Sequence, residues 1–518
     1  MPGEAIQIGP FTGGLNTFSD PTAIADNELV VCENFELDLD GSLKSRPPFV
    51  YRNIDMPLGA SGNANILGYF YGPGNVPYLI GSDGLSKTYY YSGTAWILIT
   101  DTFSATSMAQ FDNKAWLLAP YGSTNPGGRW DPSTGFTAEA EMPRGDTIVA
   151  HKQRLWVAGG RDALLNATTM YYSNQLGESP FWPTFSSTLN TIKVGSGDGQ
   201  AIVRIAVYYN SLVIFRTNSI YSYQFLNDPG AGTISLLVPN IGLSDKKSFV
   251  AYENYIYFMY DERAYEFVNN RAQQINQRVP FVSGSRSGID ESQARAVSLF
   301  NNRIIFSYFN FLYVFGLRTR TWSVWRSTTH GAIGEIFSAV TDNDFEEALL
   351  FSSTIVPSGG SRVAKTLHMS DIFTTDEEPF VCVVQTKNFN YQSSSSYKRL
   401  FWWGADAIFR GRVTAIVTPI TFNTSVTWAQ MIAYTWAAVG ANDWNQAAYP
   451  GADVQTVRDT SGGAALRKFV KFLKALRFRQ VNYRLEFDTD GSTDTSPVRL
   501  FSLMTYVRAH QRVSKTVT

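Results

Sequence analysis

Cysteine and histidine are scarce in this chain of 518 residues, which contains 2 cysteines and 4 histidines. Cys32 and Cys382 stand 350 positions apart, and such a pair supports neither a disulfide framework nor a thiolate metal site. No two histidines are spaced as metal ligands usually are. We therefore predict no metal and no cofactor, and we expect both cysteines to be buried as small apolar residues.

Charge and long apolar runs are also scarce. Charged residues make up 17% of the chain, against roughly 25% in soluble domains, and 43 basic and 44 acidic residues leave a formal charge of -1. So weak a net field predicts no specific nucleic-acid binding. The chain has no uncharged run of about 20 apolar residues and no secretory leader, which predicts no membrane insertion and synthesis in a cytoplasm.

Aromatic residues, at 14%, recur in a short repeated unit. Each copy has a ring-bearing residue, a polar turn with Asn or Gln, and an apolar run, which is the pattern of a tight hairpin that leads into a buried strand. Successive copies lie 38 to 57 residues apart, a spacing typical of β-propeller blades. The turn residues are Asn113, Gln153, Asn210, Asn254 and Asn302, with weaker copies at Asn75 and Asn343.

The repeat divides the chain into three parts. Residues 56–374 are predicted to form a β-propeller of five to seven blades, although any all-β protein has some aromatic hairpins at loose intervals. Residues 1–55 lack the repeat and are broken by Pro and Gly, which predicts an extended N-terminal arm. Residues 375–518 contain strands of alternating polarity, which predicts a second, β-sandwich-like domain. The fold class is therefore all-β.

The sequence contains only weak matches to the residue patterns of catalytic sites. The glycine-rich segment 195–199 does not match the Gly-x-Ser-x-Gly elbow that a serine nucleophile needs, and we expect a loop there. Paired carboxylates for glycoside hydrolysis are conceivable, because a propeller brings acids from different blades together, yet the available acids stand at turns. We therefore predict that the protein is not an enzyme. The acids considered are Asp261, Glu262, Asp344, Glu346 and Glu347.

One dense basic run stands near the C-terminus, interleaved with phenylalanines. It begins with Arg467, Lys468, Lys471 and Lys474. Such a patch is able to contact a polyanion or the acidic rim of a partner. The alternative is the solvated face of a short helix that leads into a strand.

The first 47 residues contain several short sequence motifs in a distinctive order. They are Gly9-Pro-Phe-Thr-Gly-Gly-Leu-Asn-Thr17, Asp20-Pro21, Ile24-Ala-Asp26, Asn34-Phe-Glu-Leu-Asp38, Gly41-Ser-Leu43 and Arg46-Pro47. This series of motifs resembles the N-terminal sequence of tail proteins of tailed bacteriophages, namely minor tail proteins or, in short-tailed phages, tail nozzle proteins. Those families are also similar to this chain in their propeller-type repeats and β-rich C-terminal part. The resemblance is close over residues 9–47 and loose over most of the rest.

The resemblance implies a structural protein of the virion tail, assembled in the host cytoplasm. It implies other phage tail proteins as partners, a ring of several copies, and a surface that contacts the host cell. Residues 1–50 are then expected to be an assembly arm, whose deletion leaves the propeller folded but outside the particle. The arm residues singled out are Phe11, Gly13, Gly14, Leu15, Asn16, Asn34 and Arg46.

Two other functions stay open at this point. A propeller at the tail tip could bind or cleave glycans, which requires exposed aromatic rings beside acids at one end of the blades. A propeller could also serve as a scaffold inside a cell, in which case the purified chain is expected to be a stable monomer.

Overall fold

The computed structural model of the chain consists of two compact units. Unit 1 comprises residues 1–48, 314–326 and 372–518, and unit 2 comprises residues 49–313 and 327–371. The structure describes residues 4–47, 50–56, 65–120, 123–125, 127–159, 167–183, 190–195, 199–281, 295–308, 311–326, 333–339, 348–355, 363–370, 380–391, 398–408, 412–420, 453–458, 468–478, 480–488 and 498–509.

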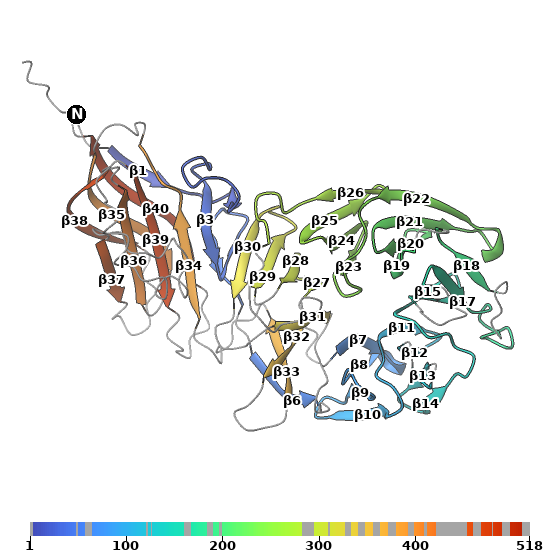
Figure 1. Cartoon of the computed structure of the whole chain (residues 1–518). Helices are drawn as coiled ribbons and strands as arrows, with labels where there is room; N and C mark the ends of the chain where they lie inside the picture. The colour runs from blue at the N-terminus through green and yellow to red at the C-terminus, as the bar shows by residue number, and fades with distance from the viewer. Residues whose placement is uncertain are drawn as a thin grey trace, which may run out of the picture. The chain divides into compact units, whose positions relative to one another are not determined.

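Unit 2 is built from antiparallel sets of strands that follow one another along the chain (Figure 1). The first three sets are β7 (Asn65–Tyr71), β8 (Pro77–Ser82), β9 (Thr88–Tyr91) and β10 (Trp96–Thr100); β11 (Ser107–Phe111), β12 (Lys114–Leu118), β13 (Gly127–Asp131) and β14 (Gly135–Ala138); and β15 (Thr147–His151), β16 (Arg154–Ala158), β17 (Thr169–Tyr172) and β18 (Thr191–Lys193). The next two are β19 (Ile202–Tyr208), β20 (Ser211–Arg216), β21 (Ser219–Gln224) and β22 (Thr233–Pro239); and β23 (Phe249–Tyr252), β24 (Tyr255–Tyr260), β25 (Arg263–Val268) and β26 (Arg271–Gln274).

Two further sets complete the ring. The sixth has β27 (Arg295–Phe300), β28 (Arg303–Tyr308) and β29 (Phe311–Gly316), and the seventh has β31 (Ile333–Ala339), β32 (Ala348–Ile355), β33 (Val363–Ser370) and β6 (Val50–Met56). First strands of neighbouring sets contact each other, β11 with β15 and β27 with β31 among them, and β31 contacts β7. The described strands therefore form a closed β-propeller of seven blades, and β6 supplies the outer strand of the last one. The all-β propeller fold is confirmed.

The predicted hairpin turns join the first and second strands of the blades. A two-residue hairpin turn requires positive φ, and φ is positive at Asp112 and Asn113, at Lys152 and Gln153, and at Asn301 and Asn302. In the turns at Asn210 and Asn254 it is the preceding residues, Tyr209 and Glu253, that have positive φ. The second strands that follow are almost fully buried, as the apolar runs predicted; Asn343 lies outside the described residues.

The third and fourth blades contact each other at His151, at the end of β15. Its side chain is 8% exposed, and its ring meets Phe225 edge-on with the centroids 5.7 Å apart. His151 Nε2 is buried without a hydrogen-bond partner among the described residues. Burial, together with the adjacent charge of Lys152, lowers the pKa of His151 to about 4, although a hydrogen bond with the backbone of Asn210 raises it.

Acidification is therefore expected to destabilise unit 2 through His151. Between pH 6.5, the ordinary pKa of histidine, and pH 4, His151 is protonated in the unfolded chain but not in the folded chain. The free energy of unfolding therefore falls as the pH drops toward 4. One pKa unit corresponds to about 1.4 kcal/mol, which puts the loss on the order of 2 kcal/mol. Urea titrations of a His151→Phe variant should show a flatter pH dependence between pH 4 and 6.5. Equal slopes for the two proteins would contradict the assignment.

Unit 1 is a sandwich of two sheets. One sheet has the order β38 (Lys468–Phe478), β35 (Lys398–Ile408), β40 (Arg499–Ala509), β5 (Leu43–Ser45) and β4 (Phe35–Leu37), and β1 (Glu4–Ile8) also pairs with β40. Within unit 1 the other sheet has β30 (Trp322–Arg326), β3 (Glu28–Glu33), β34 (Val381–Thr386), β39 (Gln480–Asp488), β36 (Arg412–Ile420) and β37 (Asp453–Arg458), with β2 (Gly14–Leu15) beside β3. The sheets meet at Tyr391, whose hydroxyl lies 2.9 Å from Tyr483 Oη and 3.1 Å from Thr505 Oγ1.

The N-terminal residues are an integral part of this sandwich, which corrects the prediction of a separate arm over residues 1–55. Glu4 pairs with Val507 and Leu29 pairs with Thr386, so the two ends of the chain share both sheets. Unit 2 includes residues 50–56 as β6, and unit 1 includes residues 314–326, so the boundary between the units falls within β29. Gly and Pro interrupt the N-terminal strands locally, and their pairing is with strands from the other end of the sequence, which is why the local pattern resembled an extended arm.

Candidate functional site

The predicted arm residues Phe11 to Asn16 lie inside unit 1. Phe11, Leu15 and Asn16 are buried, and Asn16 Nδ2 donates to Glu28 Oε2 over 3.1 Å. Gly14 has a φ of 67°, and a Cβ there would come within 2.7 Å of Thr321 Cβ, so the residue must be glycine. The buried side chains of Phe11, Leu15 and Asn16 therefore support the fold of unit 1, and a role of this segment in assembly stays a prediction.

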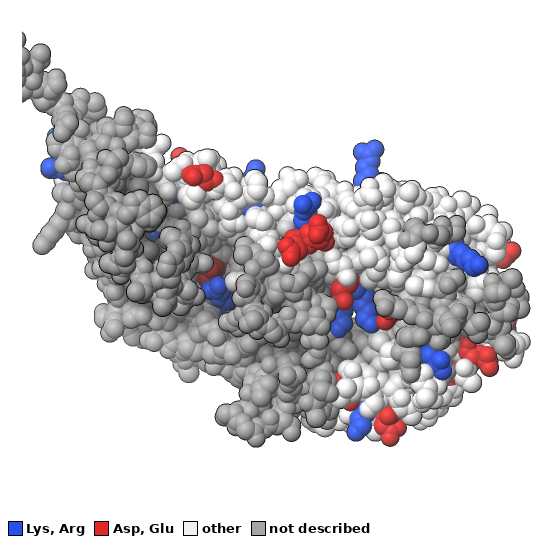
Figure 2. Space-filling view, in the orientation of Figure 1, with Lys and Arg blue, Asp and Glu red and all other residues white. Residues whose placement is uncertain are grey.

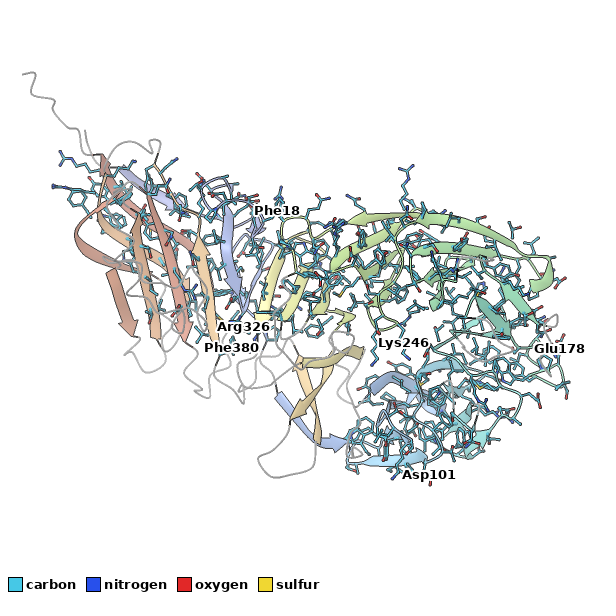
Figure 3. The ribbon with its side chains drawn as sticks, in the orientation of Figure 1. Phe18, Asp101, Glu178, Lys246, Arg326 and Phe380 are labelled. Atoms are coloured by element: carbon cyan, nitrogen blue, oxygen red, sulfur yellow. The ribbon has the colours of Figure 1, made fainter. Side chains whose placement is uncertain are left out.

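The side chain of Asn34 hydrogen-bonds to three separate segments of unit 1. Its φ is 57°, its side chain is buried, and Nδ2 donates to the Val381 carbonyl over 2.8 Å. Its Oδ1 accepts from the Arg46 Nε at 3.1 Å and from the Arg326 backbone N–H at 2.8 Å. One amide therefore joins the N-terminal strands to β30 and β34, and Figure 3 labels Arg326 beside Phe380 at this point.

Arg46 completes this buried polar group. Its guanidinium is fully buried, donates from Nη1 to the Pro47 carbonyl over 2.8 Å, and lies 3.8 Å from the centroid of the Phe380 ring. The Asn34 carbonyl accepts from the Arg46 backbone N–H at 2.8 Å and from the Cys382 thiol at 3.3 Å. Both cysteines are buried and free, as predicted. Asn34 and Arg46 thus stabilise unit 1 from within.

The basic run predicted to contact a polyanion or partner lies on a strand. Lys468, Lys471 and Lys474 belong to β38, the outermost strand of its sheet among those described, and Arg467 lies outside the described residues. The alternative of a helical face is wrong, because β38 pairs with β35 from Lys468 to Phe478. Its register places Arg477 opposite Arg399.

Neighbouring strands extend this basic character over one face of the sheet. Arg399 of β35 lies opposite Arg508 of β40 as well, and both are exposed. A bulge between Leu400 and Trp402 turns Trp402 to the same face, where it stacks on Tyr506 with ring centroids 6.0 Å apart and an interplanar angle of 8°. We call Arg399, Trp402, Tyr506 and Arg508 the outer face. The sequence did not reveal it, since the bulge and the register bring these residues together.

A second exposed feature of unit 1 is the turn between β4 and β5, residues 38–41, which we call the N-terminal turn. Leu39 at its tip is 66% exposed, between Asp38 and Asp40. Hydrogen bonds from the Ser42 hydroxyl and backbone N–H hold the pKa of Asp40 below its usual value. Phe18, in a loop of the same N-terminal segment, is 73% exposed. The turn therefore combines an apolar tip with carboxylates.

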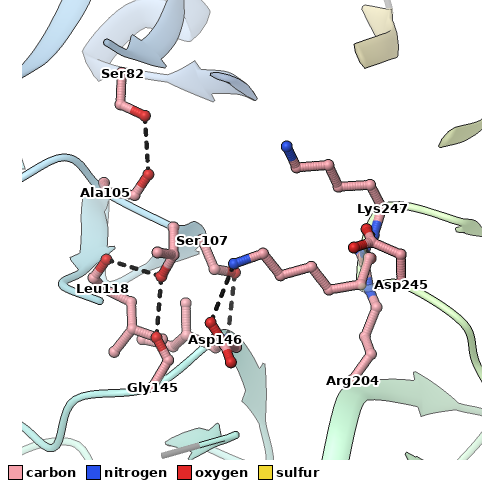
Figure 4. A network of polar contacts seen from close by, with 12 residues as sticks. Ser82, Ala105, Ser107, Leu118, Gly145, Asp146, Arg204, Asp245 and Lys247 are labelled. Atoms are coloured by element: carbon pink, nitrogen blue, oxygen red, sulfur yellow. Dashed lines mark hydrogen bonds and ion pairs between the residues drawn. The ribbon is translucent and has the colours of Figure 1, made fainter. Parts of the chain in front are cut away.

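In unit 2, polar residues gather where loops enter the first strands, at one end of the propeller. The turn before β23 is rigid, because Ser248 Oγ donates to the Asp245 carbonyl over 2.6 Å and an Asp245 carboxylate oxygen accepts the Lys247 N–H at 2.8 Å. From this turn Lys246 Nζ reaches Asp146 Oδ1, before β15, at 3.1 Å (Figures 3 and 4). Arg204 of β19 donates to the Lys246 carbonyl.

This channel-mouth cluster, Asp146, Arg204, Asp245, Lys246 and Lys247, has more bases than acids. Burial lowers the pKa of Arg204 to about 10 and that of Lys247 to about 7, while Asp245 raises both. Figure 2 shows that acidic and basic side chains are scattered over a surface whose described part is mostly white.

The acids considered for catalysis do not assemble in the described residues. Asp261 and Glu262 form the turn between β24 and β25, and Glu262 accepts from the Tyr308 hydroxyl at 2.7 Å, which joins two blades. Asp344, Glu346 and Glu347 lie outside the described residues. No group of three potential metal ligands occurs in the described part of the chain, and none of its helices has the length and apolarity to cross a bilayer.

Comparisons with known proteins give a likeness of fold. No family model and no curated protein matches the chain. The computationally designed Ika8 protein is 10% identical with a TM-score of 0.37, covering 65% of this chain and 97% of its own. The Pan2 WD40 domain of Neurospora crassa is 10% identical with a TM-score of 0.40, covering 65% and 98%. The extracellular domain of BT4673 from B. thetaiotaomicron is 12% identical with a TM-score of 0.41, covering 71% and 45%. Likeness at this level says nothing about what the protein does.

Proposed function

We propose that this protein is a non-enzymatic structural component of the tail of a tailed-bacteriophage virion, where it assembles with other tail proteins and with copies of itself. The observation that carries the proposal is the ordered series of short sequence motifs over residues 9–47, which resembles the N-terminal sequence of such tail proteins. The low charge of the chain, 17%, supports it, since a surface poor in charge suits burial against partners.

In this proposal, each unit has its own role in assembly. The seven closed blades of unit 2 make a rigid body that can hold a fixed place in a large assembly. In unit 1 the motifs of the N-terminal segment form part of the sandwich. Leu39 and Phe18 of this segment remain exposed. The contribution of the N-terminal residues to assembly is therefore expected to come through these two side chains and not through the buried residues between them.

Immunogold electron microscopy tests the proposal. Antibody raised against residues 375–518 is expected to label the tails of phage particles from the source culture, and antibody absorbed with the purified chain serves as the control. Label at the tail would support the virion function and give its position. Unlabelled particles, together with a soluble monomeric protein in cell extracts, would overturn it.

A further inference from the structure

We infer that one end of the propeller, at the fourth and fifth blades, holds a binding site for a neutral sugar. The site consists of the hairpin turns at residues 209–210, 253–254 and 269–270, which we call the three-turn site. A glycan-binding propeller requires an exposed aromatic ring beside an acid at one end of the blades, and Tyr209 and Glu253 meet this requirement at neighbouring turns. The inference concerns unit 2 alone and does not rest on the proposed virion function.

The three turns belong to one surface. They join β19 to β20, β23 to β24 and β25 to β26, and they lie at the same end because successive strands of a blade alternate in direction (Figure 1). The buried Tyr208 connects them, because its hydroxyl donates to the Asn254 carbonyl over 3.1 Å and forms a hydrogen bond with the backbone of Asn269. Its ring also packs on Phe267 of β25, with the centroids 5.5 Å apart.

Tyr209 has a conformation and an exposure that the blade itself does not require. Its φ is 51°, in the left-handed region that bulky side chains disfavour. The residues with positive φ at the same position of other blades are all polar, namely Asp112, Lys152, Glu253 and Asn301. Tyr209 is aromatic and 65% exposed. Strained residues of this kind concentrate at functional sites, which points to a ligand for this ring.

The ring of Tyr209 is held in place from within the blade. Tyr208, which is 6% exposed, meets it edge to face, with the centroids 4.6 Å apart and an interplanar angle of 80°. A tyrosine offers a rigid ring at a low cost in side-chain entropy. Such a supported and exposed ring is a platform on which the C–H face of a sugar can pack.

The other residues of the three-turn site supply hydrogen-bonding groups. They are Asn210, Glu253, Asn254, Asn269 and Asn270, and all five are exposed. None of their side chains forms a hydrogen bond or ion pair with another residue in the described part of the chain. A carboxamide donates and accepts, as a sugar hydroxyl does. The site has one acid and no base, so it suits an uncharged polyhydroxyl ligand better than a phosphate.

A protein partner is the alternative occupant, since tyrosine and asparagine are also common in antibody paratopes. A stable protein interface covers about 800 Å² on each partner and has an apolar core. The three-turn site presents a single exposed ring among short polar side chains. This small polar footprint favours a short oligosaccharide.

Saturation-transfer NMR of the full chain tests the site, with maltotriose, cellotriose, chitotriose and lactose as probes. We expect the wild type to bind at least one of them, with the strongest transfer to the C–H protons of the stacked sugar face. Tyr209→Asn introduces a residue that tolerates positive φ, so the variant should fold while its affinity for that sugar falls at least 10-fold. Asn270→Gly keeps the positive φ and removes one amide, which is expected to weaken binding about 3- to 10-fold.

A matched control removes an exposed apolar side chain outside the three turns. Leu226 is 86% exposed, and Leu226→Asn is expected to bind the sugar as the wild type does. A wild type that binds none of the four probes, or a Tyr209→Asn chain with unchanged affinity, would overturn the inference. So would a Tyr209→Asn chain that fails to enter particles although the wild type binds no sugar, because the ring would then be a protein contact.

The outcomes stay distinguishable from those for the proposed function. Tail labelling of particles does not depend on whether the purified chain binds a sugar. Labelled tails together with a wild-type chain that binds no probe would leave the virion function standing and reject the sugar site.

Discussion

An Asn34→Leu chain is expected to lose about 4 kcal/mol or more of the stability of unit 1. The substitution removes the bonds to Val381, Arg46 and Arg326, so the buried Arg46 guanidinium loses one of its acceptors. Leaving a buried donor or charge unsatisfied is more expensive than losing an exposed hydrogen bond. Urea denaturation, with hydrogen exchange followed on β3 and β34, measures the loss.

Two further variants separate the side chain from the backbone. Asn34→Gly keeps the positive φ at little strain but removes the amide, and it is expected to lose most of the same stability. Asn75→Leu places leucine at an exposed position with a φ of 59° and is expected to lose only about 1 kcal/mol. Near-native stability of Asn34→Gly would show that the hydrogen-bond group around Asn34 does not hold unit 1 together.

Removal of residues 1–56 is expected to destabilise the seventh blade, whereas removal of residues 1–47 is expected to leave that blade intact. Only the longer deletion takes away β6, whose residues pair with β33 from Val50–His368 to Met56–Ala364. Each backbone hydrogen bond contributes about 1 kcal/mol, so losing the pairing along β6 should speed hydrogen exchange in β33 by roughly 100-fold or more.

The comparison of the two deletions isolates the effect of β6, because both remove β1 to β5 from unit 1. The hydrogen-exchange protection of β31 and β33 in the shorter deletion is the reference against which the longer deletion is compared. Equal exchange of β33 in the two deletions would mean that the seventh blade is stable without its outer strand. The expectation from the sequence that a propeller survives loss of residues 1–50 thus depends on β6, which begins at Val50.

The blades could be predicted because their signal is local. Asn113 and Asn302 stand in two-residue turns whose backbone requires positive φ, and the apolar runs after them fill second strands buried between neighbouring blades. Each such signal lies within about 10 residues of sequence. The C-terminal strands were predictable for the same reason, since alternation within β39 and β40 shows one buried face.

The candidate sites could not be predicted, because they depend on long-range pairing. Arg399 and Arg508 become neighbours through strand register, and a bulge of one residue decides that Trp402 joins them. The basic run of β38 was visible in the sequence, but its strand conformation was not, because Lys and Phe at mixed spacing suit a helix as well as an edge strand.

By itself the sequence determined an all-β chain of repeated aromatic hairpins, because turn chemistry and apolar periodicity act between residues close along the chain. Only the tertiary structure decided where the N-terminal residues belong. Glu4 pairs with Val507 and Asn34 bonds to Val381, contacts whose partners lie hundreds of residues away. The short N-terminal strands acquire their conformation from those partners, and the same pairing leaves Leu39 exposed in the turn between β4 and β5 and buries Asn34 between β3 and β4.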